Sequence, residues 1–211
     1  MSQGCFISLE GIEGVGKSSQ IEFIRSFLAK NGVVDAVVTR EPGGTPIAEA
    51  IRKIFITHHA ETMVDETEFL LLFAGRAQHI ENLIKPSLQR GAWVICDRYV
   101  DSSYAYQGAG RHIPQEVITR LTEFVCKGCM PDLTLLFDAP VALALSRTQS
   151  RGSADRVEAE DEAFFERIRA AYLARAAAFP ERFRLIDASV SPEQVQAQIE
   201  SVLIDFLEKK L

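Results

Sequence analysis

CFISLEGIEGVGKSSQ, residues 5–20, is the stretch of this chain that decides its fold. Its first residues form a short run of β-type sequence, and residues 11–18 then match the pattern G-x-x-x-x-G-K-[ST]. Apolar residues at helical spacing follow, at Ile21, Ile24, Phe27 and Leu28. This pattern marks a phosphate-binding loop when it lies between a strand and a helix, and both flanks are present here. The stretch therefore predicts a nucleotide site.

Each fixed residue type in this loop has a role in holding phosphate. Gly11 and Gly16 allow positive φ, so successive N–H groups can point into one anion-sized cavity. The helix that follows adds the partial positive charge of its N-terminus. Lys17 can reach phosphate oxygens, and the Ser18 hydroxyl can ligate Mg²⁺. The expected nucleotide-binding residues are Gly11, Ile12, Glu13, Gly14, Val15, Gly16, Lys17 and Ser18.

Composition narrows the class of protein. The chain has 211 residues, of which 47% are hydrophobic and 25% charged, as is usual for a soluble globular protein. A net charge of −6 argues against binding nucleic acid through a broad basic surface. No apolar run approaches the length of a membrane span, and residues 1–4 lead into the first strand without a signal sequence. We expect a cytoplasmic protein that does not enter a membrane.

Strand and helix patterns alternate along the chain, which predicts an α/β fold with a parallel sheet. We expect five strands in a single domain, 1–211, with strands near residues 6–9, 33–39, 93–96, 133–137 and 183–186. One long helix is expected over 66–89, shortened or kinked at Pro86, and a loop over 99–111. Polar residues follow the strands, at Glu10, Arg40, Asp97, Arg98 and Asp138. Ligands bind at this edge of an open parallel sheet.

Other polar groups give weaker indications. Cys126 and Cys129 are spaced as C-x-x-C, but they close a predicted helix and lack a second ligand pair for zinc. The histidines have no acid, base or metal partner at a telling spacing, so we expect them to be structural or exposed. The mixed charges over 156–175 indicate a mostly solvated helix face.

Several motifs together resemble the bacterial thymidylate kinases. They are LEGIEGVGKS (9–18), TREPGGTPIAEAIRK (39–53), LLLFAGRAQH (70–79), VICDRYVDSSYAYQGAGR (94–111), PDLTLLFD (131–138) and RGSADRVE (151–158). The resemblance implies a P-loop kinase fold, with a five-stranded parallel sheet and a mobile lid at about 147–158. It also implies transfer of the γ-phosphoryl group of ATP to dTMP, giving dTDP and ADP, by a homodimer.

The resemblance assigns roles around the transferred phosphoryl group. Lys17, Arg98 and Arg151 are implied to be catalytic, with Arg98 binding the acceptor phosphate and Arg151 acting from the lid. Asp97 is implied to lie near the Mg²⁺ ion with Ser18. Some members carry an arginine in the phosphate loop where this chain has Val15, so here the charge must come from Lys17 and the lid.

Further residues are implied to bind dTMP. Arg52 is the second arginine on its phosphate, Glu13 faces the 3′-hydroxyl, and Arg76 donates to the thymine. Phe73 is the expected stacking ring, although many relatives have the aromatic residue at the position of Leu72. The matching positions that line the base and sugar are Ser103, Tyr106 and Gln107.

Two other functions are compatible with the phosphate loop alone. A kinase for a different nucleoside monophosphate would use the same parts. A GTP-binding switch would carry Asn-Lys-x-Asp late in the chain, where residues 131–134 read Pro-Asp-Leu-Thr. A dTMP kinase is the reading that the motifs favour.

Overall fold

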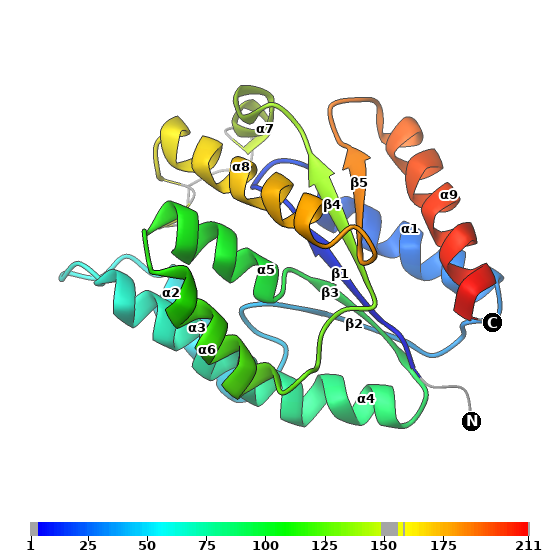
Figure 1. Ribbon diagram of the computed structural model, residues 1–211, viewed down its shortest axis with the longest axis horizontal. Coiled ribbons are helices and arrows are strands. Elements are labelled where there is room, and N and C mark those ends of the chain that lie inside the picture. The colour runs from blue at the N-terminus through cyan, green and yellow to red at the C-terminus, as the bar shows by residue number, and fades with distance from the viewer. Residues whose placement is uncertain (1–3, 149–155, 158, 211) are drawn as a thin grey trace.

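Five parallel strands form the centre of the computed structural model, which describes residues 4–148, 156–157 and 159–210 (Figure 1). The strands are Phe6–Glu10 (β1), Ala36–Arg40 (β2), Trp93–Asp97 (β3), Leu133–Asp138 (β4) and Phe183–Asp187 (β5). Their order across the sheet is β2-β3-β1-β4-β5. The predicted five-stranded parallel sheet is confirmed.

The central strand β1 is buried along its whole length. Ile7 pairs with Ile95 of β3 on one side and with Leu133 of β4 on the other. A strand with helices over both faces has no solvent face, which explains why its sequence is nearly continuous in apolar residues. The chain turns to opposite sides of the sheet around β1, so the open crevice lies beyond its carboxyl end.

Two helices cover one face of the sheet. They are α1 (Lys17–Lys30) and α9 (Pro192–Lys210), which pack against each other (Figure 1). Ile24 and Leu28 of α1 and Leu203 of α9 are fully buried there. The same helix α1 begins at the phosphate loop, so its packing on the sheet holds that loop in place.

The other helices lie toward the opposite face of the sheet and beyond the carboxyl ends of its strands (Figure 1). They are α2 (Pro46–Ile56), α3 (Asp65–His79), α4 (Lys85–Gln89), α5 (Val100–Ser103), α6 (Gln115–Cys126), α7 (Val141–Thr148) and α8 (Glu162–Ala178). Thr45 caps α2 by accepting a hydrogen bond from the Ala48 N–H, and Asp161 caps α8 in the same way through Phe164.

Two segments differ from the expected elements. The long helix expected over 66–89 is divided into α3, a π-helical turn at Ile80–Ile84 (η1), and α4. Pro86 has no N–H to donate, and the wider π turn just before it accommodates that loss. The loop expected over 99–111 was wrong, because α5 continues into a second π-helical segment, Tyr104–Gly110 (η2). Gly108 and Gly110 lie inside that segment without a left-handed backbone.

Candidate active site

The phosphate loop joins β1 to α1 as the sequence predicts. Gly11, Gly14 and Gly16 all have positive φ, at 136°, 78° and 87°. A Cβ atom at Gly14 would lie 1.9 Å from the Ala144 carbonyl oxygen, so no larger residue fits there. The loop therefore depends on glycine both for its backbone conformation and for its contact with α7.

Lys17 lies inside this loop and is buried. Its Nζ donates to the carbonyl oxygens of Gly11 and Ile12, each at 2.8 Å. Burial, followed by the nearby Arg98, lowers the pKa of Lys17 to about 8. An ammonium group has three donors, so one remains for a phosphate oxygen.

Ser18 and Asp97 meet at the carboxyl end of β3. The Ser18 hydroxyl donates to Asp97 Oδ2 at 3.0 Å. The other carboxylate oxygen, Asp97 Oδ1, is buried and accepts no hydrogen bond from the residues that the structure describes. Buried oxygens of this kind usually have a partner, and hydroxyl and carboxylate oxygens suit Mg²⁺. The pair fits the metal role expected of it.

Arg98 is held at the centre of the site. Its backbone is left-handed, with φ of 67°, which is uncommon outside glycine and frequent at functional sites. Its guanidinium donates to Glu13 Oε1 at 2.7 Å and to the Gly11 carbonyl at 2.9 Å, and lies 4.9 Å from the centre of the Tyr106 ring. The Tyr106 hydroxyl also donates to Glu13. Glu13 thus joins two residues expected to bind substrate.

A buried carboxylate, Glu10, is linked to Arg98 through two hydroxyl groups, because Arg98 Nη1 donates to Ser102 at 3.4 Å and to Tyr172 at 3.3 Å. Glu10 Oε1 accepts from the Tyr99 N–H at 2.8 Å, and Oε2 accepts from the hydroxyls of Ser102 and Tyr172 at 2.7 and 2.8 Å. Burial, together with the charge of Asp101, raises the pKa of Glu10 to about 7. The role of Tyr172 was missed, because it reaches Glu10 across 162 positions of sequence.

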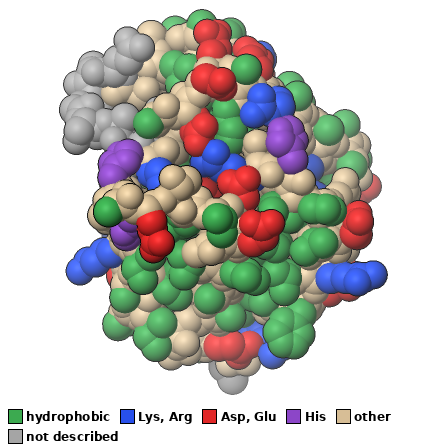
Figure 2. Space-filling view, turned by 90° about the vertical axis from the view of Figure 1, so that its left-hand side faces the viewer, with side chains coloured by type: hydrophobic (Ala, Val, Ile, Leu, Met, Phe, Trp, Pro, Cys, Tyr) green, Lys and Arg blue, Asp and Glu red, His purple; other side chains and the backbone are tan. Residues whose placement is uncertain are grey.

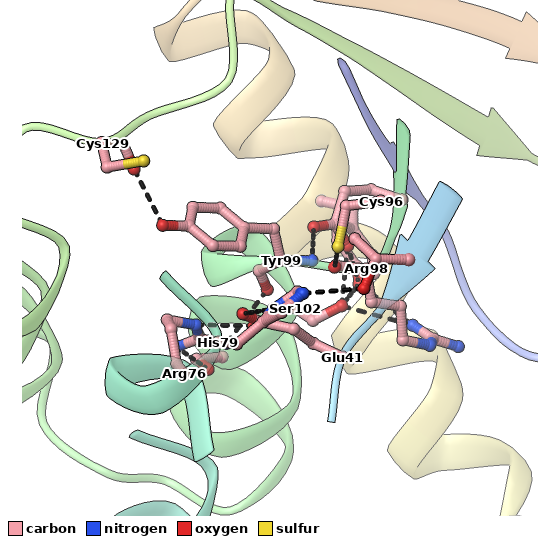
Figure 3. A network of polar contacts seen from close by, with 12 residues as sticks. Glu41, Arg76, His79, Cys96, Arg98, Tyr99, Ser102 and Cys129 are labelled. Carbon is pink, nitrogen blue, oxygen red and sulfur yellow. Dashed lines mark hydrogen bonds and ion pairs between the residues drawn. The ribbon is translucent and has the colours of Figure 1, made fainter. Parts of the chain in front are cut away.

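Arg76 forms the second cationic centre, and its side chain is only 2% exposed (Figure 3). Its Nε donates to Glu41 at 2.7 Å, Nη1 donates to Ser103 Oγ at 3.0 Å, and Nη2 donates to the Tyr99 carbonyl at 3.3 Å. Burial opposes the charge of Arg76, but the Glu41 carboxylate raises its pKa above the ordinary value. One N–H on each terminal nitrogen is left over from these three bonds.

Glu41 links Arg76 to a buried histidine. The second oxygen of Glu41 lies 3.0 Å from His79 Nδ1, and His79 Nε2 lies 2.7 Å from the Thr39 hydroxyl. His79 is buried, in keeping with the structural role expected of it, although its acidic partner could not be found from spacing. Glu41 and His79 are 38 positions apart, and helix spacing carries no information about such a pair.

One cavity collects most of the expected site residues. Its wall includes phosphate-loop residues together with Arg52, Leu72, Arg76, Asp97, Arg98, Ser103, Tyr106 and Gln107. Arg52 Nη1 donates to the Pro42 carbonyl at 3.0 Å, and Gln107 Nε2 donates to Glu68 at 2.8 Å. In the space-filling view, charged side chains of both signs lie near the centre of the face that carries α2 (Figure 2).

Phe73 does not line this cavity. Its ring packs edge-on against Phe69, with centroids 4.9 Å apart, and it belongs to the core behind the cavity. Leu72 takes the place on the wall instead. The structure thus places Phe73 under Arg76, 4.7 Å from the guanidinium carbon, rather than where a base would stack.

The lid arginine Arg151 lies outside the described residues. Next to that segment, Arg147 Nη1 donates to the Ala188 carbonyl at 2.8 Å. Arg156 lies 2.7 Å from Glu68, donates to the Phe55 carbonyl at 3.2 Å, and covers the Phe55 ring. The expectation of a solvated face fails at Arg156, which is bound to α2 and α3.

Comparisons with known proteins agree with these features. The family model described as thymidylate kinase matches residues 9–199. A thymidylate kinase of Pseudomonas putida (strain GB-1) is 49% identical over 206 residues, which cover 98% of each chain. One of Alcanivorax borkumensis is 49% identical over 200 residues, covering 95% of this chain and 96% of the relative.

A solved structure is also similar. The crystal structure of thymidylate kinase from Ehrlichia chaffeensis superposes with a TM-score of 0.76 at 31% identity. The match covers 95% of this chain and 99% of that one. Within the described residues, no helix has the length and apolar character to cross a membrane.

Proposed function

The chain belongs to the thymidylate kinase family, and we propose how its cavity carries out the reaction of that family. The enzyme transfers the γ-phosphoryl group of ATP to dTMP. An oxygen of the dTMP phosphate forms a bond to the γ-phosphorus, the bond from that phosphorus to the β-γ bridging oxygen breaks, and ADP leaves. The observation that carries this proposal is a single cavity lined by the phosphate loop, Arg98 and Arg76.

In this proposal the donor triphosphate lies on the phosphate loop, residues 11–18. The loop N–H groups and the N-terminus of α1 bind the β-phosphate. Lys17 donates a hydrogen bond to the γ-phosphoryl oxygens. Ser18 Oγ and the unpaired Asp97 Oδ1 would hold Mg²⁺, which supplies positive charge to the phosphate oxygens when bound.

The acceptor phosphate is assigned to Arg98, with Arg52 as a second cation. Arg98 is fixed by contacts within the protein, to Glu13 and to the Gly11 carbonyl. Because the guanidinium is already placed, little reorganisation is needed when the phosphate binds. Glu13 and Tyr106 then lie where they can contact the sugar, as expected from the family.

The base is assigned to the region of Arg76 and Gln107, with Ser103 beside them and Leu72 on the wall. The free N–H groups of Arg76 suit the O4 carbonyl oxygen of thymine, an acceptor. Cytosine carries an amino donor at that position. Phe73 does not contact the base in this proposal. Its ring packs against the Arg76 guanidinium from the core.

We propose a homodimer formed through α3 and α6. Exposed apolar side chains occur on both helices, among them Leu70 at 57% and Phe124 at 74%. Hydrophobic side chains gather in the lower half of the face shown in Figure 2. An exposed apolar surface of this kind marks an interaction site. Analytical ultracentrifugation of the protein, with Phe124→Glu as the variant, tests this.

We also place the reaction in the cytoplasm. All four cysteines, Cys5, Cys96, Cys126 and Cys129, are free thiols. Free thiols persist in reducing compartments.

The decisive experiment measures ADP release by a coupled assay over a panel of dTMP, dUMP, dCMP and dGMP, with and without Mg²⁺. We expect Mg²⁺-dependent turnover with dTMP preferred over dCMP and dGMP, and none for Lys17→Ala. Equal kcat/KM for all the monophosphates would show that the Arg76 region does not read the base. Full turnover without divalent cations would remove the metal role of Ser18 and Asp97.

A further inference from the structure

A buried carboxylate, Glu68, lies behind the wall of the cavity. It projects from α3, and its side chain is 2% exposed. Three side chains converge on it from other parts of the chain. Gln107 Nε2 lies 2.8 Å from Oε1, Arg156 Nη2 lies 2.7 Å from Oε2, and Arg111 Nε lies 3.3 Å from Oε2.

Two arginines keep the carboxylate in position. Arg156 is fixed in turn by the Phe55 carbonyl, and Arg111 by Glu160 and the Phe164 ring. A buried carboxylate without such partners would be strongly destabilising. Glu68 is therefore placed by its cationic neighbours and not by the cavity.

This contact fixes the orientation of the Gln107 amide. An amide group can turn over and exchange its oxygen with its nitrogen. A carboxylate accepts hydrogen bonds and has none to donate, so Gln107 must direct its NH₂ group at Glu68. With the amide nitrogen held by Glu68, the amide oxygen is the acceptor that Gln107 can offer to the cavity, whose wall includes both Gln107 and Arg76.

The two groups on the wall then present different hydrogen-bonding characters. Arg76 offers N–H donors, and Gln107 offers a carbonyl acceptor. Thymine matches this pair, with O4 as the acceptor and N3–H as the donor. Cytosine has the opposite pattern, since its N4 amino group donates and its N3 accepts. If Gln107 turned over, its NH₂ group would suit the N3 of cytosine.

We infer that Glu68 is the positioning residue that locks the Gln107 amide and so selects thymine over cytosine at N3. Glu68 touches neither substrate and acts only through Gln107. The inference rests on the proposed function, because it requires the base to lie against Gln107.

The test compares kcat/KM for dTMP and dCMP in the full-length enzyme carrying Glu68→Gln. The new amide can either accept from Gln107 or donate to it, so the lock is released with little change of shape. We expect the dTMP/dCMP ratio to fall about tenfold or more, the size of one mispaired buried hydrogen bond. The ratio should change because kcat/KM falls for dTMP and rises for dCMP. The KM for ATP should not change. If Glu68 had a purely structural role, the substitution would lower kcat/KM for dTMP and for dCMP by the same factor.

Three further variants make the result decisive. Glu66→Gln makes the same chemical change on the exposed side of α3 and should leave the ratio unchanged. Arg156→Met removes one ion pair but leaves Arg111 to hold Glu68 beside Gln107, so the ratio should also persist. Glu68→Asp keeps the buried charge and draws it back from Gln107. If urea denaturation shows that Glu68→Gln does not fold, the dTMP/dCMP ratio is measured on Glu68→Asp instead, and we expect it to fall there as well.

Gln107→Leu separates the two possible failures. If Gln107→Leu lowers the ratio and the folded Glu68 variants do not, Glu68 does not orient the amide and the inference is overturned. If none of these variants changes the ratio, Gln107 does not read the base, and that part of the proposed function fails as well.

Discussion

Glu10→Gln should remove a pH dependence of stability that originates directly beneath the active site. Glu10 is fully buried at the end of β1 and accepts hydrogen bonds from the Tyr99 N–H and from the Ser102 and Tyr172 hydroxyls. Glutamine keeps an acceptor for the Tyr99 N–H. The two hydroxyls can rotate to accept from its NH₂ group, so the fold should persist.

The magnitude follows from the raised pKa of Glu10. Burial first, and then the charge of Asp101, raise this pKa from 4.5 to about 7, against the opposing effects of Ser102, Arg98 and Tyr172. The folded protein therefore binds this proton more tightly than the unfolded chain does. Binding of this proton stabilises the folded protein fully below pH 4.5, and the stabilisation is lost as the pH rises to about 7. Between pH 5 and pH 8 the loss amounts to roughly 2–3 kcal/mol, since a difference of one pKa unit corresponds to a little over 1 kcal/mol.

Urea denaturation of both proteins between pH 5 and pH 8 provides the measurement. Trp93 is the single tryptophan and is buried at the start of β3, so its fluorescence reports unfolding. The free energy of unfolding of the wild type, minus that of Glu10→Gln, should fall as the pH rises. Taking the difference cancels the other titrating groups. A difference that stays constant within about 0.5 kcal/mol, small against the expected loss, would refute the reasoning.

Three further predictions concern the reaction. Lys17→Ala should abolish phosphoryl transfer while leaving the melting temperature nearly unchanged, and near wild-type turnover in the folded variant would contradict it. dTMP should be preferred to dCMP by a kcat/KM ratio equivalent to about 1–3 kcal/mol, because Arg76 would face the cytosine amino group; comparable values would show that the pocket is misassigned. Arg151→Ala should lower kcat by roughly 10³-fold with little change in dTMP affinity, because Val15 leaves the phosphate loop without an arginine. A loss seen only in KM would make Arg151 a binding residue, and no loss would move the role to Arg147 or Arg156.

The phosphate loop was predictable because its requirements are local. Positive φ at Gly11 and Gly16, the lysine and the hydroxyl all fall within one turn between a strand and a helix. The ends of the parallel strands were predictable for a related reason. Parallel strands bring their carboxyl ends to one edge, so Asp97 and Arg98 had to lie near the loop.

The supporting carboxylates were not predictable in the same way. Glu41 meets His79, Glu68 meets Gln107, and Glu10 meets Tyr172, each across tens of positions or more. Glu68 stands between the exposed Thr67 and the buried Phe69, and a glutamate at such a boundary is usually exposed.

The choice between Phe73 and Leu72 depended on the rotation of one helix. Both are apolar and both fit a buried position, so periodicity does not decide which of them faces the cavity. In the structure the ring fills the core against Phe69, and Leu72 faces the cavity. Residues 99–111 were misjudged because glycines are typical of turns and loops, whereas here Gly108 and Gly110 lie within a π-helical segment.

The arrangement of these carboxylates explains how a protein with a net charge of −6 can bind two polyanions. The cations of the site do not form a broad positive surface. Arg98 is held by Glu13 and Arg76 by Glu41, each at 2.7 Å. The acidic partners offset the cost of burying each guanidinium and fix its direction, while donors of Arg76 remain for the base. Such pre-placed donors need little reorganisation during phosphoryl transfer, and electrostatic catalysis depends on this property. In the proposed reaction, selectivity thus depends on Glu41 and Glu68, two glutamates that act through Arg76 and Gln107.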